Sequence, residues 1–158
     1  MTITIIKDNF GELKIVCRGG TNPPCDHLPV MFDTETHTLS RVSVVSCDPN
    51  MLTCLRRMCG ERGDTPRIEL SNSTVSEPDI RTSLATFHSI SMKGVNLQLI
   101  PNMFNGMKTI YMLLDTNVIK SLPDDTFNGS NFVEIKIINN DFEHITKNAF
   151  RGRYFKHF

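Results

Sequence analysis

Apolar residues recur along this chain in fixed slots. The segment 109–123 superposes on the segment 132–145 when it is shifted by 23 residues. Segments that repeat every 20 to 29 residues, roughly, indicate a solenoid and not a single closed core. In a solenoid, successive coils of the chain stack on one another. The matched pairs are Met112 with Ile135, Leu114 with Ile137, Asn117 with Asn140, Ile119 with Phe142, Leu122 with Ile145 and Phe127 with Phe150.

Three earlier copies carry the same alternation of apolar and polar residues. The copy before the first matched pair lacks the asparagine, and in the earliest copy Cys47 stands in the asparagine slot. Because neighbouring side chains of a strand point to opposite sides, each alternation predicts a strand, and the repeat makes the strands parallel. The earlier copies comprise Ile90, Met92, Val95, Leu97 and Ile100, then Ile68 and Leu70, then Val42 and Val44. We expect strands near 42–44, 68–70, 90–92, 112–114 and 135–137.

These slots follow the leucine-rich-repeat pattern L-x-x-L-x-L-x-x-N-x-L. The inward residues of each short strand would fill the solenoid, and the asparagine amide would satisfy backbone groups where the chain leaves the sheet. Phe104, Phe127 and Phe150 should stack in a column on the outer side. We therefore predict an α/β fold, a leucine-rich-repeat solenoid with a curved parallel sheet on its concave side and short helical or 3-10 turns outside.

Two short helices are expected between the first strands. Asp48-Pro49 is typical of a helix N-cap followed by proline at the first helical position, and Leu52, Leu55 and Met58 would share one face. This pattern predicts a helix near 49–58. A second helix is expected after Ser76.

The two ends of the chain differ. Residues 3–6 and 13–17 alternate like the strands of a hairpin that closes one end of the solenoid. At the other end, residues 151–158 begin a further repeat, with Phe155 and Phe158 in its first slots. We therefore predict an N-terminal cysteine-rich cap with the first repeat strand over 1–64, and repeats that stop without a C-terminal cap over 65–158.

Charge and hydropathy exclude several classes of partner. Seventeen basic residues balance seventeen acidic ones, so no overall field favours nucleic acid or an anionic membrane. No stretch approaches the roughly 18 to 20 apolar residues that span a bilayer. We expect neither nucleic acid nor membrane contact by this chain.

The cysteines and two acceptor tripeptides point to an extracellular setting. All five cysteines, Cys17, Cys25, Cys47, Cys54 and Cys59, fall in the first 59 residues, as in a disulfide-stapled cap, and the odd number leaves one without a partner. Asn72-Ser73-Thr74 and Asn128-Gly129-Ser130 match the N-glycosylation acceptor.

The residues between the inward slots should point to the concave face, which is the candidate ligand-binding surface. Its charge is mixed, and Tyr111, Leu113 and Ile138 are the apolar candidates for anchoring a protein partner. An ordinary solvated surface is the alternative interpretation. The face comprises Arg41, Ser43, Val45, Arg67, Glu69, Ser71, Ser89, Ser91, Lys93, Tyr111, Leu113, Asp115, Glu134, Lys136 and Ile138.

With its hairpin Ile3 to Cys17, its strand Arg41 to Cys47 and its repeats with Leu122-Pro123-Asp124-Asp125-Thr126-Phe127, the chain resembles the N-terminal part of an insect Toll receptor ectodomain. The resemblance implies a Cys17–Cys47 disulfide, and recognition of a dimeric cystine-knot cytokine of the Spätzle type. It also implies a membrane-anchored parent protein at the cell surface, with receptor dimerisation and signalling through a cytoplasmic domain. Cys25, Cys54 and Cys59 depart from the family pattern.

Other functions remain as alternatives. Arg62-Gly63-Asp64 matches a tripeptide that some integrins bind, which would suit a secreted adhesion or matrix protein, although an ordinary turn is sufficient to explain it. The five histidines, His27, His37, His88, His144 and His157, are scattered without a catalytic or metal-binding spacing. We therefore expect neither an enzyme nor a metal or cofactor. A soluble decoy or a partial gene product is the third alternative.

Overall fold

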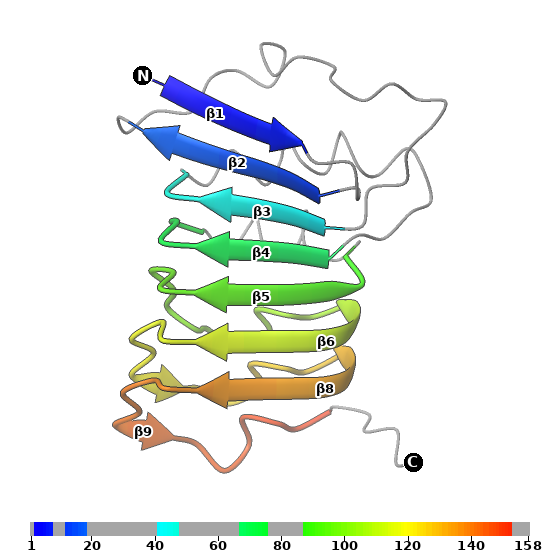
Figure 1. Ribbon diagram of the computed structural model, residues 1–158. Helices are drawn as coiled ribbons and strands as arrows, with labels where there is room; N and C mark the ends of the chain where they lie inside the picture. Colours follow the sequence, from blue (N-terminus) through cyan, green and yellow to red (C-terminus); the bar gives the residue numbers. More distant parts are fainter. Residues whose placement is uncertain (1, 8–11, 19–40, 48–66, 76–86, 153–158) are drawn as a thin grey trace.

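The computed structural model describes residues 2–7, 12–18, 41–47, 67–75 and 87–152. Seven strands form one sheet in the order β1-β2-β3-β4-β5-β6-β8, and β7 and β9 form a second sheet of two short strands (Figure 1). The strands of the large sheet are β1 (Thr2–Lys7), β2 (Glu12–Arg18), β3 (Arg41–Val45), β4 (Arg67–Ser71), β5 (Ser89–Lys93), β6 (Lys108–Asp115) and β8 (Asn131–Ile138). The small sheet pairs β7 (Ser121–Leu122) with β9 (His144–Ile145).

The large sheet is a stack of coils in strict register. From β2 to β8 every pair of neighbours is parallel, and the first inward slot forms one row, Val42, Ile68, Ile90, Met112 and Ile135. The second inward slot runs beside it through Val44, Leu70, Met92, Leu114 and Ile137. The predicted strands and their parallel order are therefore confirmed, and the chain is a parallel-strand solenoid.

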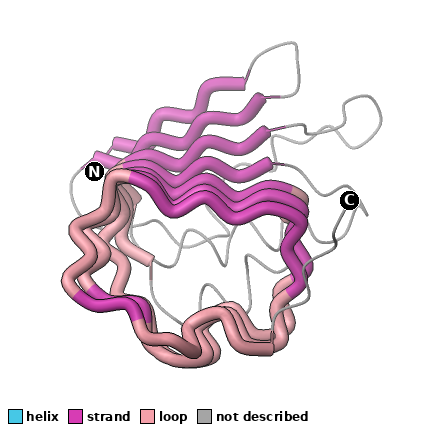
Figure 2. Tube along the Cα trace, turned by 90° about the horizontal axis from the view of Figure 1, so that it is seen from below, coloured by secondary structure: helices cyan, strands magenta, loops and turns pink. Residues whose placement is uncertain are grey.

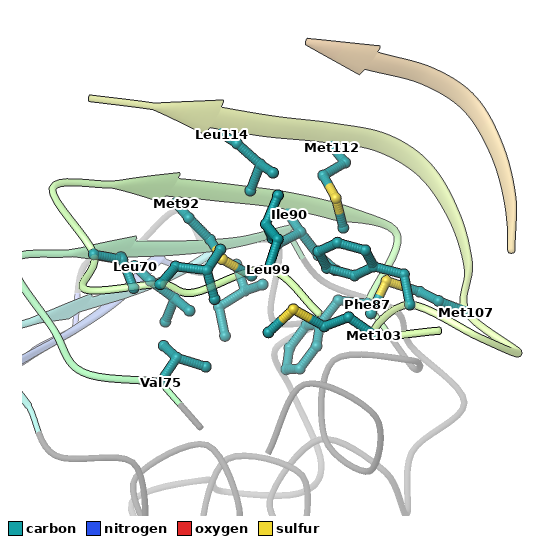
Figure 3. Close-up of a cluster of buried hydrophobic side chains, with 14 of the residues drawn as sticks. Leu70, Val75, Phe87, Ile90, Met92, Leu99, Met103, Met107, Met112 and Leu114 are labelled. Carbon is teal, nitrogen blue, oxygen red and sulfur yellow. The ribbon is translucent and has the colours of Figure 1, made fainter. Parts of the chain in front are cut away.

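Viewed from below the stack, the strands of the large sheet lie on one side, and the chain returns on the other through loops and the short strands β7 and β9 (Figure 2). The space between them is filled by the inward side chains of the strands and of the returning segments, such as Leu99, Met103 and Met107 (Figure 3). Each coil thus buries its apolar slots against the next coil, which is why the apolar residues repeat.

The predicted phenylalanine column is present on the outer side. The ring of Phe127 stacks on Phe104 at 5.1 Å and on Phe150 at 5.3 Å between centroids. Phe132, which the repeat pattern did not single out, meets the rings of Phe104 and Phe127 edge-on. Phe127 is completely buried, whereas Phe150 in the last described coil is 41% exposed.

Asparagine performs the predicted role at the turn after β6. The Asn117 side chain is buried, its Oδ1 accepts a hydrogen bond from the Val95 amide at 2.8 Å, and its Nδ2 donates to the Met92 carbonyl at 3.0 Å. Ser73 fills the same slot two coils earlier, where its hydroxyl accepts a hydrogen bond from the Cys47 amide. The repeat pattern did not single out this serine, because its copy was matched only at Ile68 and Leu70.

The outer side differs from the prediction. No helix occurs among the described residues, so this part of the chain does not have the predicted α/β class. Its coils return through hydrogen-bonded turns and not through 3-10 segments. The physical reason is backbone conformation. Asn102, Gly106 and Asp125 have a positive φ, whereas a 3-10 helix needs a negative φ at every residue, so these residues interrupt the runs of turns. The helices expected near 49–58 and after Ser76 lie outside the described residues.

A hairpin and a disulfide mark the N-terminal end of the sheet. Strand β1 is antiparallel to β2, which is parallel to β3. Cys17 of β2 and Cys47 after β3 form a disulfide, the pair that the family resemblance implies, and both residues are buried. The disulfide therefore joins the hairpin covalently to the first repeat strand.

Candidate binding face

One face of the large sheet points away from the core. Along β3, β4, β5, β6 and β8 the residues between the inward slots are half-buried or exposed while their neighbours are buried, except that the inward slots of β8 are half-buried. All fifteen residues predicted for the concave face lie on this side. We call this surface the outward face.

The register arranges the outward face in three rows that cross the strands. The first row is Arg41, Arg67, Ser89, Tyr111 and Glu134. The second is Ser43, Glu69, Ser91, Leu113 and Lys136, and the third is Val45, Ser71, Lys93, Asp115 and Ile138. Side chains that are 22 to 26 residues apart in the sequence are therefore neighbours at the roughly 4.8 Å spacing of adjacent strands.

A depression of about 340 Å³ lies in the first two rows. Its position follows from side-chain size: β5 contributes only Ser89 and Ser91, while β4 contributes Arg67 and Glu69, and β6 contributes Tyr111 and Leu113. Two small residues between larger ones leave the sheet face hollow at β5. The volume is at the lower end of the roughly 300 to 1,000 Å³ of ligand pockets, large enough for a few side chains of a partner.

The two arginines of the first row differ in their ion pairs. Arg41 lies between two carboxylates, with Nη1 at 2.7 Å from Glu12 and Nε at 3.4 Å from Glu69. Arg67 is exposed, its register neighbours are Arg41 and Ser89, and among the described residues no carboxylate pairs with it. The depression therefore has one guanidinium whose charge is neutralised and one whose charge is available.

An apolar ridge borders the depression on the side of β6 and β8. Ile110 is 46% exposed and Val133 is 39% exposed, next to the half-buried Tyr111 and Leu113. The predicted face did not include Ile110 and Val133, because it was drawn only from residues that alternate with the inward slots of each strand. Here two successive residues point outward between the buried Thr109 and Met112, and this doubled outward pair recurs in the next coil. The L-x-x-L spacing at the start of the repeat pattern is the signal that could have found them, because it leaves two residues between successive inward slots.

Comparison of the chain with protein-family models, with curated proteins and with solved structures finds no match. The arrangement of the outward face is therefore the basis for any functional conclusion.

The far edge of the face is held by a polar network. Asp115 accepts hydrogen bonds from the Asn139 amide at 2.9 Å and the Thr116 hydroxyl at 2.8 Å, and these bonds lower the pKa of its carboxyl. The hydrogen bond to Glu134 raises the pKa of Lys136, whose ammonium also lies 5.5 Å from the Tyr111 ring centroid. Both groups stay charged at neutral pH, so the edge is a fixed set of charges.

The two predicted glycosylation acceptors have different surroundings. Asn72 is exposed at the end of β4. Asn128 is half-buried, and its Nδ2, the atom that a glycan would occupy, donates a hydrogen bond to Asn102 at 3.1 Å. Asn72 is therefore the more accessible of the two acceptors.

Several other predicted features lie elsewhere. Arg62-Gly63-Asp64, Cys25, Cys54 and Cys59 are outside the described residues. Within the described ranges, no three His, Cys, Asp or Glu side chains are grouped so as to hold a metal ion. Nor does the described part contain a helix of the length and apolar character needed to cross a membrane.

Proposed function

We propose that this chain is the ligand-binding N-terminal part of a cell-surface leucine-rich-repeat receptor of the insect Toll type, a binding scaffold and not an enzyme. Its ligand would be a cystine-knot cytokine of the Spätzle type, held by protein–protein contacts on the outward face. Signalling would then fall to a cytoplasmic domain of the parent protein.

The leucine-rich-repeat assignment is supported by the separate role of each slot. The inward slots form continuous buried rows, Asn117 satisfies backbone groups of the preceding coil, and the phenylalanines stack outside. The Toll-type assignment is supported by the Cys17–Cys47 disulfide, which links the hairpin to the turn after the first repeat strand. A buried disulfide also suits an extracellular protein.

The observation that carries the binding proposal is the depression beside an exposed apolar ridge. Interfaces draw most of their energy from a few large side chains that are packed around a recess, with polar groups at the rim. Tyr111, Leu113 and Ile110 provide such a group, next to the depression over β5. Ile110 is 46% exposed and lines the depression together with Tyr111 and Leu113.

The test is to place a charge in the ridge and measure cytokine binding. The chain, secreted from insect cells with its disulfide intact, is immobilised and titrated with a purified Spätzle-type dimer in a surface plasmon resonance assay. Leu113→Asp and Tyr111→Asp should each weaken binding at least about tenfold, because each would set a charge against an apolar partner surface. Val118→Asp is the matched control, because Val118 is 62% exposed and is not part of the outward face.

The outcomes separate the parts of the proposal. If both ridge variants bind as tightly as the wild type while keeping its thermal stability, the outward face is not the binding surface. If the wild-type chain binds none of the cytokines of this class, the proposed ligand is wrong.

A further inference from the structure

The most unusual group on the outward face is the guanidinium of Arg67. It is exposed, and within the described part of the chain neither an ion pair nor a hydrogen bond engages it. The residue directly beside it on β3 is Arg41, so two like charges occupy adjacent positions of one row, an arrangement that costs stability unless something offsets it. Glu12 and Glu69 offset the charge of Arg41. The charge of Arg67 is left for a partner.

The surroundings of Arg67 are those of an anion site of limited size. The floor of the depression beside it carries the hydroxyls of Ser89 and Ser91, and neither hydroxyl is engaged by another described residue. His88 lines the same depression. Hydroxyl, guanidinium and imidazole groups can all donate hydrogen bonds to a carboxylate, and a guanidinium can do so with two parallel bonds.

The opposite wall narrows the choice of anion. Tyr111 and Leu113 lie two strand spacings from β4, about 10 Å away, and present apolar surface to the depression. Glu69 lines the depression too and would repel a ligand with many negative charges, such as a sulfated polysaccharide. A ligand with one carboxylate beside one apolar side chain matches both walls, because the carboxylate can face Arg67 and the apolar side chain can face Tyr111 and Leu113. An exposed loop of a protein can supply these two neighbouring side chains.

We infer that the depression over β5 receives an aspartate or glutamate side chain of the bound protein, whose carboxylate pairs with Arg67 and accepts hydrogen bonds from Ser89 and Ser91, while a neighbouring apolar residue packs on Leu113 and Tyr111. The inference deepens the proposed function, since it rests on protein recognition by the outward face. It assigns Arg67 as the residue that selects the acidic group.

The experiment uses random linear peptides displayed on phage, selected in parallel on the wild-type chain, on Arg67→Gln and on Lys147→Gln. Lys147 is an exposed lysine of the outer side, so its variant removes a cation away from the face. Peptides selected on the wild type and on Lys147→Gln should share an acidic residue next to an apolar one. A synthetic peptide of that consensus should bind Arg67→Gln at least about tenfold more weakly, because a hydrogen-bonded charge pair is lost.

A double-mutant cycle tests whether Arg67 contacts the acidic residue of the peptide directly. Changing the acidic residue of the peptide to its amide should weaken binding to the wild type by the same factor, and should cause no further loss with Arg67→Gln. Peptides without an acidic preference, or equal affinity for the wild type and Arg67→Gln, would overturn the inference. So would binding of a heparin-derived oligosaccharide that depends on Arg67 when the peptides show no acidic preference.

The same variant separates this inference from the proposed function. If Leu113→Asp abolishes binding of the cytokine while Arg67→Gln leaves it unchanged, the proposed function stands and the acidic contact is refuted. If acidic peptides depend on Arg67 but no Spätzle-type cytokine binds, the acidic site stands and the proposed ligand is wrong.

Discussion

Asn117 is the side chain whose removal tests the stacking of the coils most directly. It is 2% exposed, and it joins the turn after β6 to the preceding coil through the Val95 amide and the Met92 carbonyl. Asn117→Ala deletes both hydrogen bonds and places no other polar group within the core. The two backbone groups would remain buried without a partner.

The magnitude follows from those two groups. A buried donor or acceptor that loses its partner costs about 1 to 3 kcal/mol, so the free energy of unfolding should fall by about 2 to 6 kcal/mol. Proteins of this size are stable by about 5 to 15 kcal/mol in total, so the loss is a large fraction of the whole. With a urea dependence of about 2 kcal/mol per molar, the unfolding midpoint should drop by about 1 to 3 M.

The assay is urea unfolding of the oxidised chain, followed by circular dichroism. Asn96→Ala is the matched control, because Asn96 is an exposed asparagine next to Val95 whose removal should change stability by no more than about 0.5 kcal/mol. Asn117→Ser should lose less than Asn117→Ala, because Ser73 already performs a similar role in an earlier coil. A loss below about 1 kcal/mol for Asn117→Ala, or one equal to that of Asn96→Ala, would refute the assigned role of the asparagine slot.

Three further predictions concern single positions. Gly106→Ala and Gly129→Ala should each cost about 1 to 2 kcal/mol in thermal unfolding, because both glycines have a positive φ. The asparagine oxygen that a Cβ at Gly129 would meet is the end of the exposed Asn105 side chain and can turn away, so unchanged stability in either variant would contradict this. The folded-state pKa of Asp115 is lowered, so its contribution to stability is present above the unfolded pKa of about 3.9 and is lost as pH falls through the folded value. Asp115→Asn should therefore flatten the acid branch of a stability profile measured in urea at a series of pH values, and an unchanged branch would show that the network at the edge of the face does not contribute. Mass spectrometry of the chain secreted from insect cells should find a glycan on Asn72 and none on Asn128, whose side-chain amide is half-buried and engaged in the fold; a glycan on Asn128 would contradict this prediction.

The repeat pattern predicted much of the architecture because a solenoid encodes its core locally. Every coil needs the same apolar slots, so the strands, their parallel order and the phenylalanine column follow from residues that recur at 22 to 26 positions. The outer turns were harder to predict. Whether a short polar segment forms a 3-10 helix or a series of turns depends on residues of positive φ, and Asn102 and Asp125 give little sign of that in sequence.

The candidate site could be predicted from the sequence only in part. Alternation alone assigned fifteen residues to the outward face, since a strand has only two sides. It could not assign Ile110 and Val133 to that face, because they break the alternation. Nor could it distinguish Arg41 from Arg67, which are both arginines that begin a strand.

By itself, the sequence determined the two inward rows of the large sheet, because burial along each strand depends on a pattern contained in a few consecutive positions. Only the tertiary structure decided that Arg41 is paired and that Arg67 lies beside two serines and opposite Tyr111. Those relations hold between residues of different coils. They depend on the register of neighbouring strands and on the sizes of the side chains that meet across that register. Neither the register nor the set of facing side chains can be read from a single stretch of the chain.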